Sequence, residues 1–399
     1  MINFLRYLGC FILGATVALS VSISSTENSF NASHYRNADY PLLADVIDTI
    51  ETYYVDEIDR DQLVQAAIDG IFKKLDPYSG FLTHEDFQAI NNSNRGEYFG
   101  FGFEIATDDG QITIITPFKN SPAEKAGIVA SDKIVKFNNI KVDETNLQTI
   151  LTDIRKHSLN NLPIELTLQH AGDTKQFELT LSPDVIHIES INSKIIQQSI
   201  GYIKLTNFQD NATEAILRQA HKWQQAPLTG LILDLRNNPG GLLEQAINIA
   251  DLFLSQGKIV STTGRFFDAN EDYYASSSAI FNELPLVILI NKGSASASEV
   301  LAAALKENNR ATIIGETSFG KGTVQSLIPI LNDGNAIKLT IAEYRTPKGN
   351  NIHTKGIVPD IEISISPITD DTNMSIIDSH KLKDNHIDSA IAWIEGRES

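Results

Sequence analysis

The second half of the chain constrains the fold most, because short apolar runs alternate there with segments of amphipathic helical spacing. The expected strands are 201–205, 230–235, 286–290 and 311–314. The expected helices are 212–225, 243–254 and 297–306. Strands buried on both faces are continuous apolar runs, and parallel neighbours need a crossover that is usually a helix. The pattern therefore predicts an α/β fold with a mostly parallel sheet covered by helices. Functional residues are expected where its strands end and its helices begin.

The regions on either side of this pattern have a different texture. Apolar positions recur at helical spacing early in the chain, which predicts a helical N-terminal region over 38–95. Glycines, aromatic residues and alternating strand patterns follow, so we expect a mainly β domain over 96–183. The α/β region then spans 184–365, and a polar tail over 366–399 contains one short helix.

The N-terminus has the pattern of a targeting segment. Residues 1–25 carry Arg6, then an uncharged apolar run over 7–23, and they end in small residues. Such a pattern is typical of a secretory signal peptide or a single membrane anchor, so we expect export, with 26–37 as a polar linker. The single cysteine, Cys10, lies inside the apolar run, so no disulfide is expected in the exported part.

Charge and motif content exclude several classes of function. The formal net charge is −18, which disfavours a general affinity for nucleic acid or for an anionic membrane surface. The sequence has no HExxH motif and no cysteine cluster, and we expect neither a metal nor a cofactor. His221 and His353 lie in the α/β region and leave a Ser-His-Asp triad open, although such histidines are more often surface or packing residues.

Two expected turns between a strand and a helix contain the residues best suited to chemistry. In DLRNNPGGL, residues 234–242, the adjacent Gly240 and Gly241 allow a sharp turn with exposed N–H groups, as an oxyanion site requires. A tight connection with no ligand is an equal alternative. In NKGSASASEV, residues 291–300, Ser296 lies at a helix N-terminus, where a developing anion is favoured.

Ser296 also has a simpler interpretation. Glu299 follows it by three residues, which forms a capping box, and serines in that position usually only cap the helix. The neighbouring alanines, Ala295 and Ala297, keep the hydroxyl sterically accessible. The local sequence favours the cap and leaves the nucleophile open.

A serine nucleophile needs a base, and GETSFGKGT, residues 315–323, offers Lys321. This stretch is a near miss to a phosphate-binding loop, because Gly322 stands where Ser or Thr would hold magnesium, and a strand pattern follows instead of a helix. Lys321 can act as a base only if burial lowers its pKa from about 10.4 towards 7 or 8. Gln325, four residues on, shares a face with Lys321 on an extended strand and is placed to orient the amine.

Six segments, in this order, resemble the C-terminal processing (tail-specific) peptidases, a family of Ser-Lys proteases with an inserted PDZ domain. The segments are LDPYS at 75–79, FGFGF at 99–103, SPAEKAGI at 121–128, LRNNPGG at 235–241, SASASE at 294–299 and FGKGTVQ at 319–325. The resemblance covers roughly residues 40–365. It implies a crotonase/Clp-like protease core, an inserted β-rich PDZ domain and an N-terminal helical region.

The resemblance also implies roles for individual residues. Ser296 corresponds to the nucleophile, Lys321 to the general base and Gln325 to the residue that orients it. The oxyanion hole corresponds to the amide of Ala297 with that of Gly240 or Gly241. The implied reaction is acyl transfer: the serine attacks a peptide carbonyl, the lysine protonates the leaving amine, and water hydrolyses the acyl-enzyme.

The FGFGF segment resembles the carboxylate-binding loop of a PDZ domain, which adds a peptide C-terminus as an extra strand. The corresponding residues are Phe99, Gly100, Phe101, Gly102 and Phe103, and a core-packing role is expected for one of Phe101 and Phe103. The sequence departs from the usual pattern at Ser131, where glycine is common, and over 156–163, which lacks a Gly-Thr turn. These departures are expected to affect loop geometry and fine specificity.

The expected partners follow from the same resemblance. They are proteins or peptides with apolar C-termini, an adaptor protein, and a second copy of the chain bound through the N-terminal helices. The expected location is the periplasm or cell envelope. The alternatives are a catalytically silent PDZ scaffold that binds C-termini, and a different enzyme on a crotonase-like sheet, which would need an acidic base in place of Lys321.

Overall fold

The computed structural model describes residues 40–108, 110–224, 226–277, 279–281, 283–330, 334–363 and 384–396. The chain divides into two compact units, residues 1–75 and 76–399. In the first unit the structure describes two helices, α2 (Tyr40–Tyr53) and α3 (Arg60–Phe72), joined by ion pairs from Arg60 to Asp48 and Glu51. The expected targeting segment and linker lie outside the described residues. Among the described helices, none has both the length and the apolar character needed to span a membrane.

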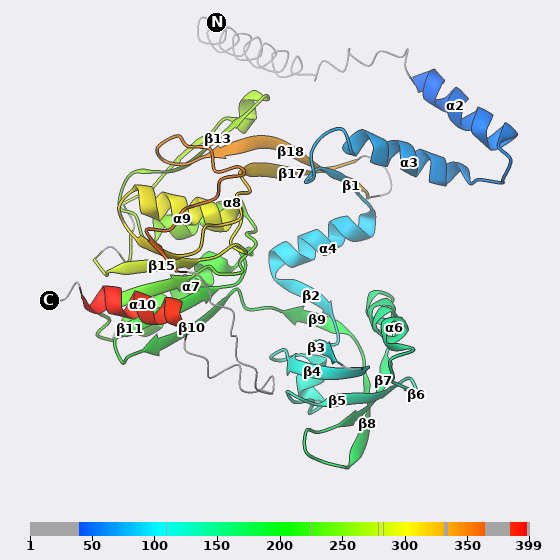
Figure 1. Ribbon diagram of the computed structural model, residues 1–399, viewed down its shortest axis with the longest axis horizontal. Helices are drawn as coiled ribbons and strands as arrows, with labels where there is room; N and C mark the ends of the chain where they lie inside the picture. The colour runs from blue at the N-terminus through cyan, green and yellow to red at the C-terminus, as the bar shows by residue number, and fades with distance from the viewer. Residues whose placement is uncertain are drawn as a thin grey trace, which may run out of the picture. The chain divides into compact units, whose positions relative to one another are not determined.

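The second unit contains the predicted parallel sheet (Figure 1). Its strands, in spatial order, are β10 (Ile191–Ile196), β11 (Ile200–Leu205), β12 (Gly230–Asp234), β15 (Leu286–Ile290), β16 (Thr312–Gly315) and β19 (Ile361–Glu362). All neighbours are parallel except β10, which lies antiparallel at the edge. Every residue of β12 and β15 is buried, which explains why both sequences are apolar except for Asp234 at the end of β12.

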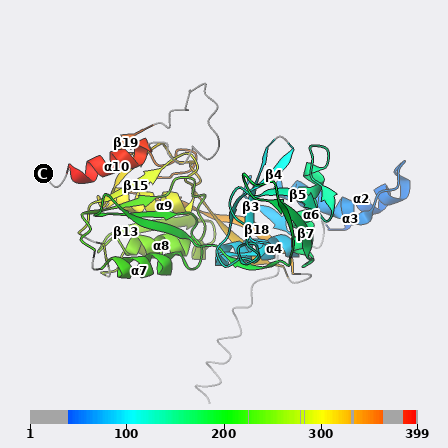
Figure 2. The ribbon, with the colours of Figure 1, turned by 90° about the horizontal axis from the view of Figure 1, so that it is seen from below.

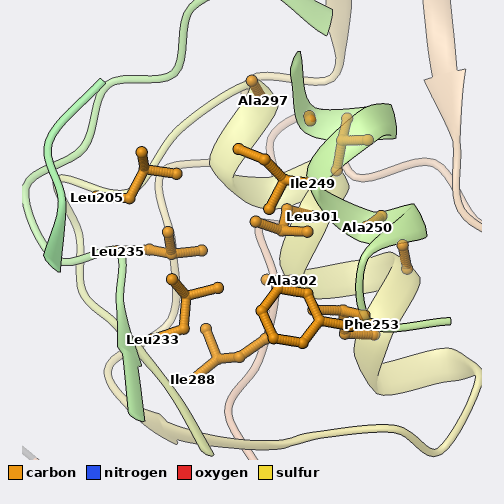
Figure 3. Close-up of a cluster of buried hydrophobic side chains, with 14 of the residues drawn as sticks. Leu205, Leu233, Leu235, Ile249, Ala250, Phe253, Ile288, Ala297, Leu301 and Ala302 are labelled. Atoms are coloured by element: carbon orange, nitrogen blue, oxygen red, sulfur yellow. The ribbon is translucent and has the colours of Figure 1, made fainter. Parts of the chain in front are cut away.

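Helices cover both faces of this sheet. On one face, α7 (Ala212–Trp223), α8 (Leu243–Asp251) and α9 (Ala297–Glu307) pack against alternate strand residues such as Leu233 and Ile288 (Figure 3). On the other face, α10 (Asn385–Glu395) packs against the intervening residues, including Ile232 and Leu289. Figure 2 shows α10 and α7 on opposite sides of β15. The period of two along each strand thus divides the core into two layers.

A second, antiparallel sheet was not predicted as such. β18 (Ala336–Arg345) pairs with β17 (Thr323–Pro329), β1 (Gly80–Leu82) and β13 (Lys258–Gly264), and β13 also pairs with β14 (Asp272–Tyr274). The short 3-10 helix η1 (Phe267–Ala269) and α4 (His84–Arg95) complete this part of the chain. The sheet joins segments about 260 residues apart in sequence, since Gly80 aligns with Lys338.

The inserted β-rich domain is a separate small sheet. It contains β3 (Phe103–Asp108), β4 (Gln111–Pro117), β5 (Lys133–Phe137), β6 (Ile140–Lys141), β7 (Ile164–Gln169) and β8 (Gln176–Leu181), with helices α5 (Pro122–Lys125) and α6 (Leu147–Leu159). A two-stranded ribbon of β2 (Glu97–Gly100) and β9 (Asp184–His187) flanks it in sequence. Its core is its own, built around residues such as Phe137 and Leu166.

Candidate active site

Ser296 lies in the turn between β15 and α9, as the strand–helix pattern predicts. Its backbone angles are φ 55° and ψ −116°, a conformation that costs a non-glycine residue about 1–3 kcal/mol. The surrounding turn is held by its own polar side chains. Asn291 accepts from the Gly293 amide at 3.0 Å, and the Ser294 hydroxyl donates to the Leu235 carbonyl at 2.8 Å. The strained serine therefore sits in a rigid frame.

Ser296 and Glu299 form the capping box that the sequence predicts at the start of α9. The Glu299 carboxylate accepts from the Ser296 amide at 2.8 Å, and the Glu299 amide donates to the Ser296 carbonyl at 2.8 Å. The Ser296 hydroxyl also lies beside Tyr344: burial raises the pKa of Tyr344 to about 12, and a hydrogen bond with Ser296 moderates the rise. The capping box and the contact with Tyr344 are thus both present at Ser296, and the cap leaves the nucleophile open.

Glu299 also connects the turn that contains Ser296 (residues 291–296, the serine turn) to the segment that contains Lys321 (residues 318–322, the lysine segment). Its side chain is 1% exposed and accepts four hydrogen bonds. One oxygen receives the Ser296 and Lys321 amides, at 2.8 and 2.9 Å. The other receives the Ser318 hydroxyl and the Gly320 amide, both at 2.6 Å. The main chains of Ser296 and Lys321 therefore meet at a single carboxylate oxygen.

Lys321 precedes β17 and is half-buried. Its ammonium nitrogen lies 5.0 Å from the centre of the Tyr78 ring. Burial lowers its pKa, and the charge of Lys338 adds to this, while Asp76 and Glu299 oppose it. The direction is the one that a general base requires. Among the described residues the amine makes no hydrogen bond and no ion pair.

The glycine after Lys321 is needed for a close approach of two backbones. A Cβ on Gly322 would lie 2.5 Å from the His353 backbone nitrogen, which is closer than real side chains come. The Gly322 amide also points at the ring of His353, 3.4 Å from Nδ1. The closeness of the His353 backbone therefore requires a glycine at position 322. His353 thus contacts the lysine segment, whereas His221 lies exposed on α7.

Gln325 lies within β17, but its amide is not bound to Lys321. It donates to the Thr323 hydroxyl at 2.8 Å and to the Thr340 hydroxyl at 3.3 Å. β17 begins only at Thr323, so Lys321 is outside the strand and the four-residue spacing does not place the two side chains on one face. The sequence-based argument for a contact between Lys321 and Gln325 is therefore not met by this arrangement.

The two glycines of the first turn have different surroundings. Gly240 has φ 108°, and a Cβ there would lie 2.9 Å from the Ser296 Cβ and 3.0 Å from the Ala297 nitrogen. Gly241 instead faces the Phe208 carbonyl. The Gly240 amide already donates to Asn238 at 2.9 Å, while in the described part of the chain the amides of Gly241 and Ala297 have no acceptor. Gly240 therefore allows the close approach, and Gly241 has the available donor.

A network of charged side chains holds the start of the glycine turn. Arg236 donates to both oxygens of Asp234 and, through a second fork, to both oxygens of Asp384 at 2.9 and 2.8 Å. Tyr202 adds a bond to Asp234 at 2.7 Å. Asp384 is the N-cap of α10, so the C-terminal helix is tied to the turn. The sequence analysis missed this link, because nothing local relates residue 384 to residue 236.

Sequence reasoning also missed the contact between LDPYS and the lysine. The segment carried the family resemblance, but no role followed from it. In the structure Tyr78 faces Lys321 and Asp76 bonds to Thr340 at 3.1 Å. The only signal in the sequence was the motif itself.

In the inserted domain, the FGFGF segment is held mainly through its carbonyls. Phe99, Phe101 and Gly102 accept from the Ser158 hydroxyl, the Ala123 amide and the Phe118 amide, at 2.8, 3.0 and 2.8 Å. Phe101 is 4% exposed and packs in the core with Ile150, whereas Phe103 is only partly buried. Gly100 is buried at the end of β2. Of the two phenylalanines, Phe101 is therefore the one that packs in the core.

The departures from the usual pattern also have visible consequences. Ser131 adopts φ 72°, a left-handed conformation that glycine takes more easily. Asp132 beside it is fully buried and accepts from the Val129 amide at 3.0 Å. Asn161, within the unusual 156–163 segment, has φ 54°. The chain therefore keeps both turns at some cost in backbone strain.

Comparisons with known proteins agree with these features. Residues 199–363 match peptidase family S41, residues 98–181 match a PDZ domain, and residues 6–86 match the N-terminal domain of the activating protease CtpB. The carboxy-terminal-processing protease of Bartonella bacilliformis is 37% identical over 357 residues, which is 88% of this chain and 81% of that protein. The carboxy-terminal processing protease CtpA of Bacillus subtilis is 33% identical over 359 residues, 89% of this chain and 76% of that protein.

Among solved structures, a putative S41 protease from Bacteroides fragilis has a TM-score of 0.54 at 14% identity, covering 80% of this chain and 90% of that one. At this identity the likeness concerns the fold. It agrees with an α/β protease core that carries an inserted β-rich domain. From the family match and the full-length relatives it follows that the chain belongs to peptidase family S41, the carboxy-terminal processing proteases, and carries a PDZ domain.

Proposed function

We propose that this protein is an exported serine endopeptidase that cleaves proteins recognised by an apolar C-terminal tail, with Ser296 as nucleophile and Lys321 as general base. One observation carries the proposal: a single buried oxygen of Glu299 binds the amides of both residues. The lowered pKa of Lys321, caused first by burial, supports its role as a base. The place of Ser296 at the N-terminus of α9, where a developing anion is favoured, supports its role as a nucleophile.

In the proposed reaction, Lys321 takes the proton of the Ser296 hydroxyl as the serine oxygen attacks the peptide carbonyl carbon. The amides of Ala297 and Gly241 donate to the oxyanion that forms. Lys321 then gives the proton to the leaving amine, and the peptide bond breaks. A water molecule attacks the acyl carbon while Lys321 takes its proton, and the ester bond then breaks as Lys321 gives that proton to the Ser296 oxygen.

Cleavage by active-site variants tests the chemistry. Ser296→Ala and Lys321→Ala should each abolish cleavage of an unfolded protein with an apolar C-terminus. Because Ser296 belongs to a capping box, Ser296→Ala should also lower the free energy of unfolding by about 1 kcal/mol while the protein stays folded. Proteolysis that survives Ser296→Ala would contradict the assignment. A variant that binds the tail without cutting it would show how the alternative, a catalytically silent PDZ scaffold, behaves in the same assay.

Tail recognition is proposed for the FGFGF segment of the PDZ domain, whose backbone amides would hold the terminal carboxylate. A substrate with an amidated C-terminus should then be processed more slowly than the same substrate with a free carboxylate. Equal rates would refute this part of the proposal and leave the chemistry untouched. An adaptor protein and a homodimer through the N-terminal helices belong to the same proposal.

Export to the periplasm or cell envelope rests on the charge and apolar pattern of residues 1–25. Fractionation of cells that make the full chain, or a chain lacking these residues, tests it. The full chain should appear in the envelope fraction, as a cleaved or an anchored form. A full chain found only in the cytosol would contradict export.

A further inference from the structure

The LDPYS motif forms a turn directly before β1. Asp76 accepts from the Tyr78 amide at 2.8 Å, from the Ser79 amide at 2.9 Å and from the Ser79 hydroxyl at 2.8 Å. Although burial works against them, these bonds hold the pKa of the Asp76 carboxyl below its ordinary value. We name residues 76–79 the DPYS turn. Its geometry is fixed by one ionised side chain.

The DPYS turn is anchored to β18 at a defined place. The Thr340 amide donates to the Ser79 hydroxyl at 3.0 Å, and the Thr340 hydroxyl donates to Asp76 at 3.1 Å. The same Thr340 hydroxyl receives the side-chain amide of Gln325 at 3.3 Å. The strand register is consistent with these contacts, because Gly80 pairs with Lys338 and Gln325 pairs with Thr340. The turn is thus connected to Gln325 through one threonine.

The turn also places Tyr78 against Lys321. The ammonium nitrogen lies 5.0 Å from the ring centre, and an aromatic face attracts a cation at this distance. The ring of His353 stands edge-on to Tyr78, with centres 6.4 Å apart, and steadies its orientation. In the described part of the chain the Tyr78 hydroxyl makes no hydrogen bond. The contact to Lys321 therefore depends on the ring face, not on the hydroxyl.

Several other groups act on the Lys321 ammonium. Lys338 on β18 disfavours the charged form, while Asp76 in the DPYS turn and Glu299 on α9 favour it. His353 lies next to the Gly322 amide and the Tyr78 ring. Of the groups that favour the cation, Asp76 and the Tyr78 ring both belong to the DPYS turn. Removing the Tyr78 ring face should therefore disfavour the charged form of Lys321.

We propose that the DPYS turn is a positioning element of the active site, in which the Tyr78 ring holds the Lys321 ammonium and Asp76, through Thr340, holds the Gln325 amide. The proposal rests on the proposed role of Lys321 as general base. Lys321 carries a proton between its removal from Ser296 and its delivery to the leaving amine. Tyr78 gives the protonated lysine a defined location. The turn thereby links the N-terminal part of the unit to the catalytic step.

The test compares Tyr78→Leu, which removes the aromatic face, with Tyr78→Phe, which keeps it. The measurement is the pH dependence of kcat/KM on an unfolded protein with an apolar C-terminus. Tyr78→Leu should move the acidic limb to lower pH by about half a unit to one unit, because loss of the contact destabilises the ammonium. It should lower kcat with little effect on KM, since Tyr78 acts through Lys321. Tyr78→Phe should restore the position of the limb.

Equal acidic limbs for Tyr78→Leu and Tyr78→Phe would overturn the proposal. If Tyr78→Leu fails to fold, Tyr78→Met serves as the second variant without an aromatic face. Direct titration of Lys321 by NMR of ¹³C-labelled lysine, with its signal assigned by loss in Lys321→Met, gives a readout that needs no activity. Its pKa should fall in Tyr78→Leu or Tyr78→Met and not in Tyr78→Phe. Proteolysis that persists in Ser296→Ala would instead count against the proposed function, so the two failures are distinguishable.

Discussion

Replacing Glu299 with glutamine tests how the serine and lysine segments are joined. A glutamine of the same shape has one accepting oxygen and one donating NH₂ group. If the oxygen faces the Ser296 and Lys321 amides, the NH₂ group meets the Ser318 hydroxyl and the Gly320 amide. The hydroxyl can rotate and accept, but the Gly320 N–H is then buried without an acceptor.

The magnitude follows from these four contacts. An unpaired buried donor costs about 1–3 kcal/mol, and bonds to a neutral oxygen are weaker than those to a carboxylate. Relief from burying a charge offsets part of the loss. We expect Glu299→Gln to lower the free energy of unfolding by about 2–3 kcal/mol, measured by urea denaturation. Because Glu299 raises the pKa of Lys321, loss of its charge should also lower that pKa and move the acidic limb of kcat/KM to lower pH.

Asp132→Asn is the matched control. Asp132 is likewise fully buried, accepts from the Val129 amide and pairs with His170 at 2.6 Å, but it lies in the PDZ domain. The same change from acid to amide there should reduce stability without moving the acidic limb. A Glu299→Gln enzyme with the stability and pH profile of the wild type would refute the reasoning, and so would a limb that moves equally in the control.

Three further variants test other parts of the site. Gly240→Ala should abolish proteolysis, because the new methyl group would lie 2.9 Å from the Ser296 Cβ; activity within twofold of the wild type would contradict the close approach. Lys321→Met should be inactive but raise the melting temperature, because it removes a cation that burial disfavours. The pKa of Lys321 is lower in the folded chain than in the unfolded one. The gain in stability from Lys321→Met should therefore be full below the folded pKa and vanish above the ordinary lysine pKa, and melting curves at several pH values would measure it. Asp384→Ala should lower the free energy of unfolding by about 1–3 kcal/mol, because Arg236 loses a bidentate partner, and an unchanged urea midpoint would contradict it.

The parallel sheet and its helices follow from local sequence patterns. The run 286–290 is apolar at every position, and 230–235 is apolar except for Asp234, because both faces of those strands are covered, and this pattern is local. The sequence also indicated the two turns that contain Ser296 and Gly240, since a serine or a glycine pair at a strand–helix junction has few uses. The motif order indicated the family before any coordinates.

The tertiary structure decided which residues meet. Glu299 was expected as a helix cap, and only the fold shows its carboxylate binding the segment of Lys321 as well. The antiparallel sheet brings Asp76 and Tyr78 to Lys321 across about 240 residues of chain, and pairing between strands so far apart leaves no periodic signal in the sequence. The pKa of Lys321 likewise depends on burial and on neighbours from separate segments. Local patterns specify elements, whereas contacts between distant elements set the electrostatics of the site.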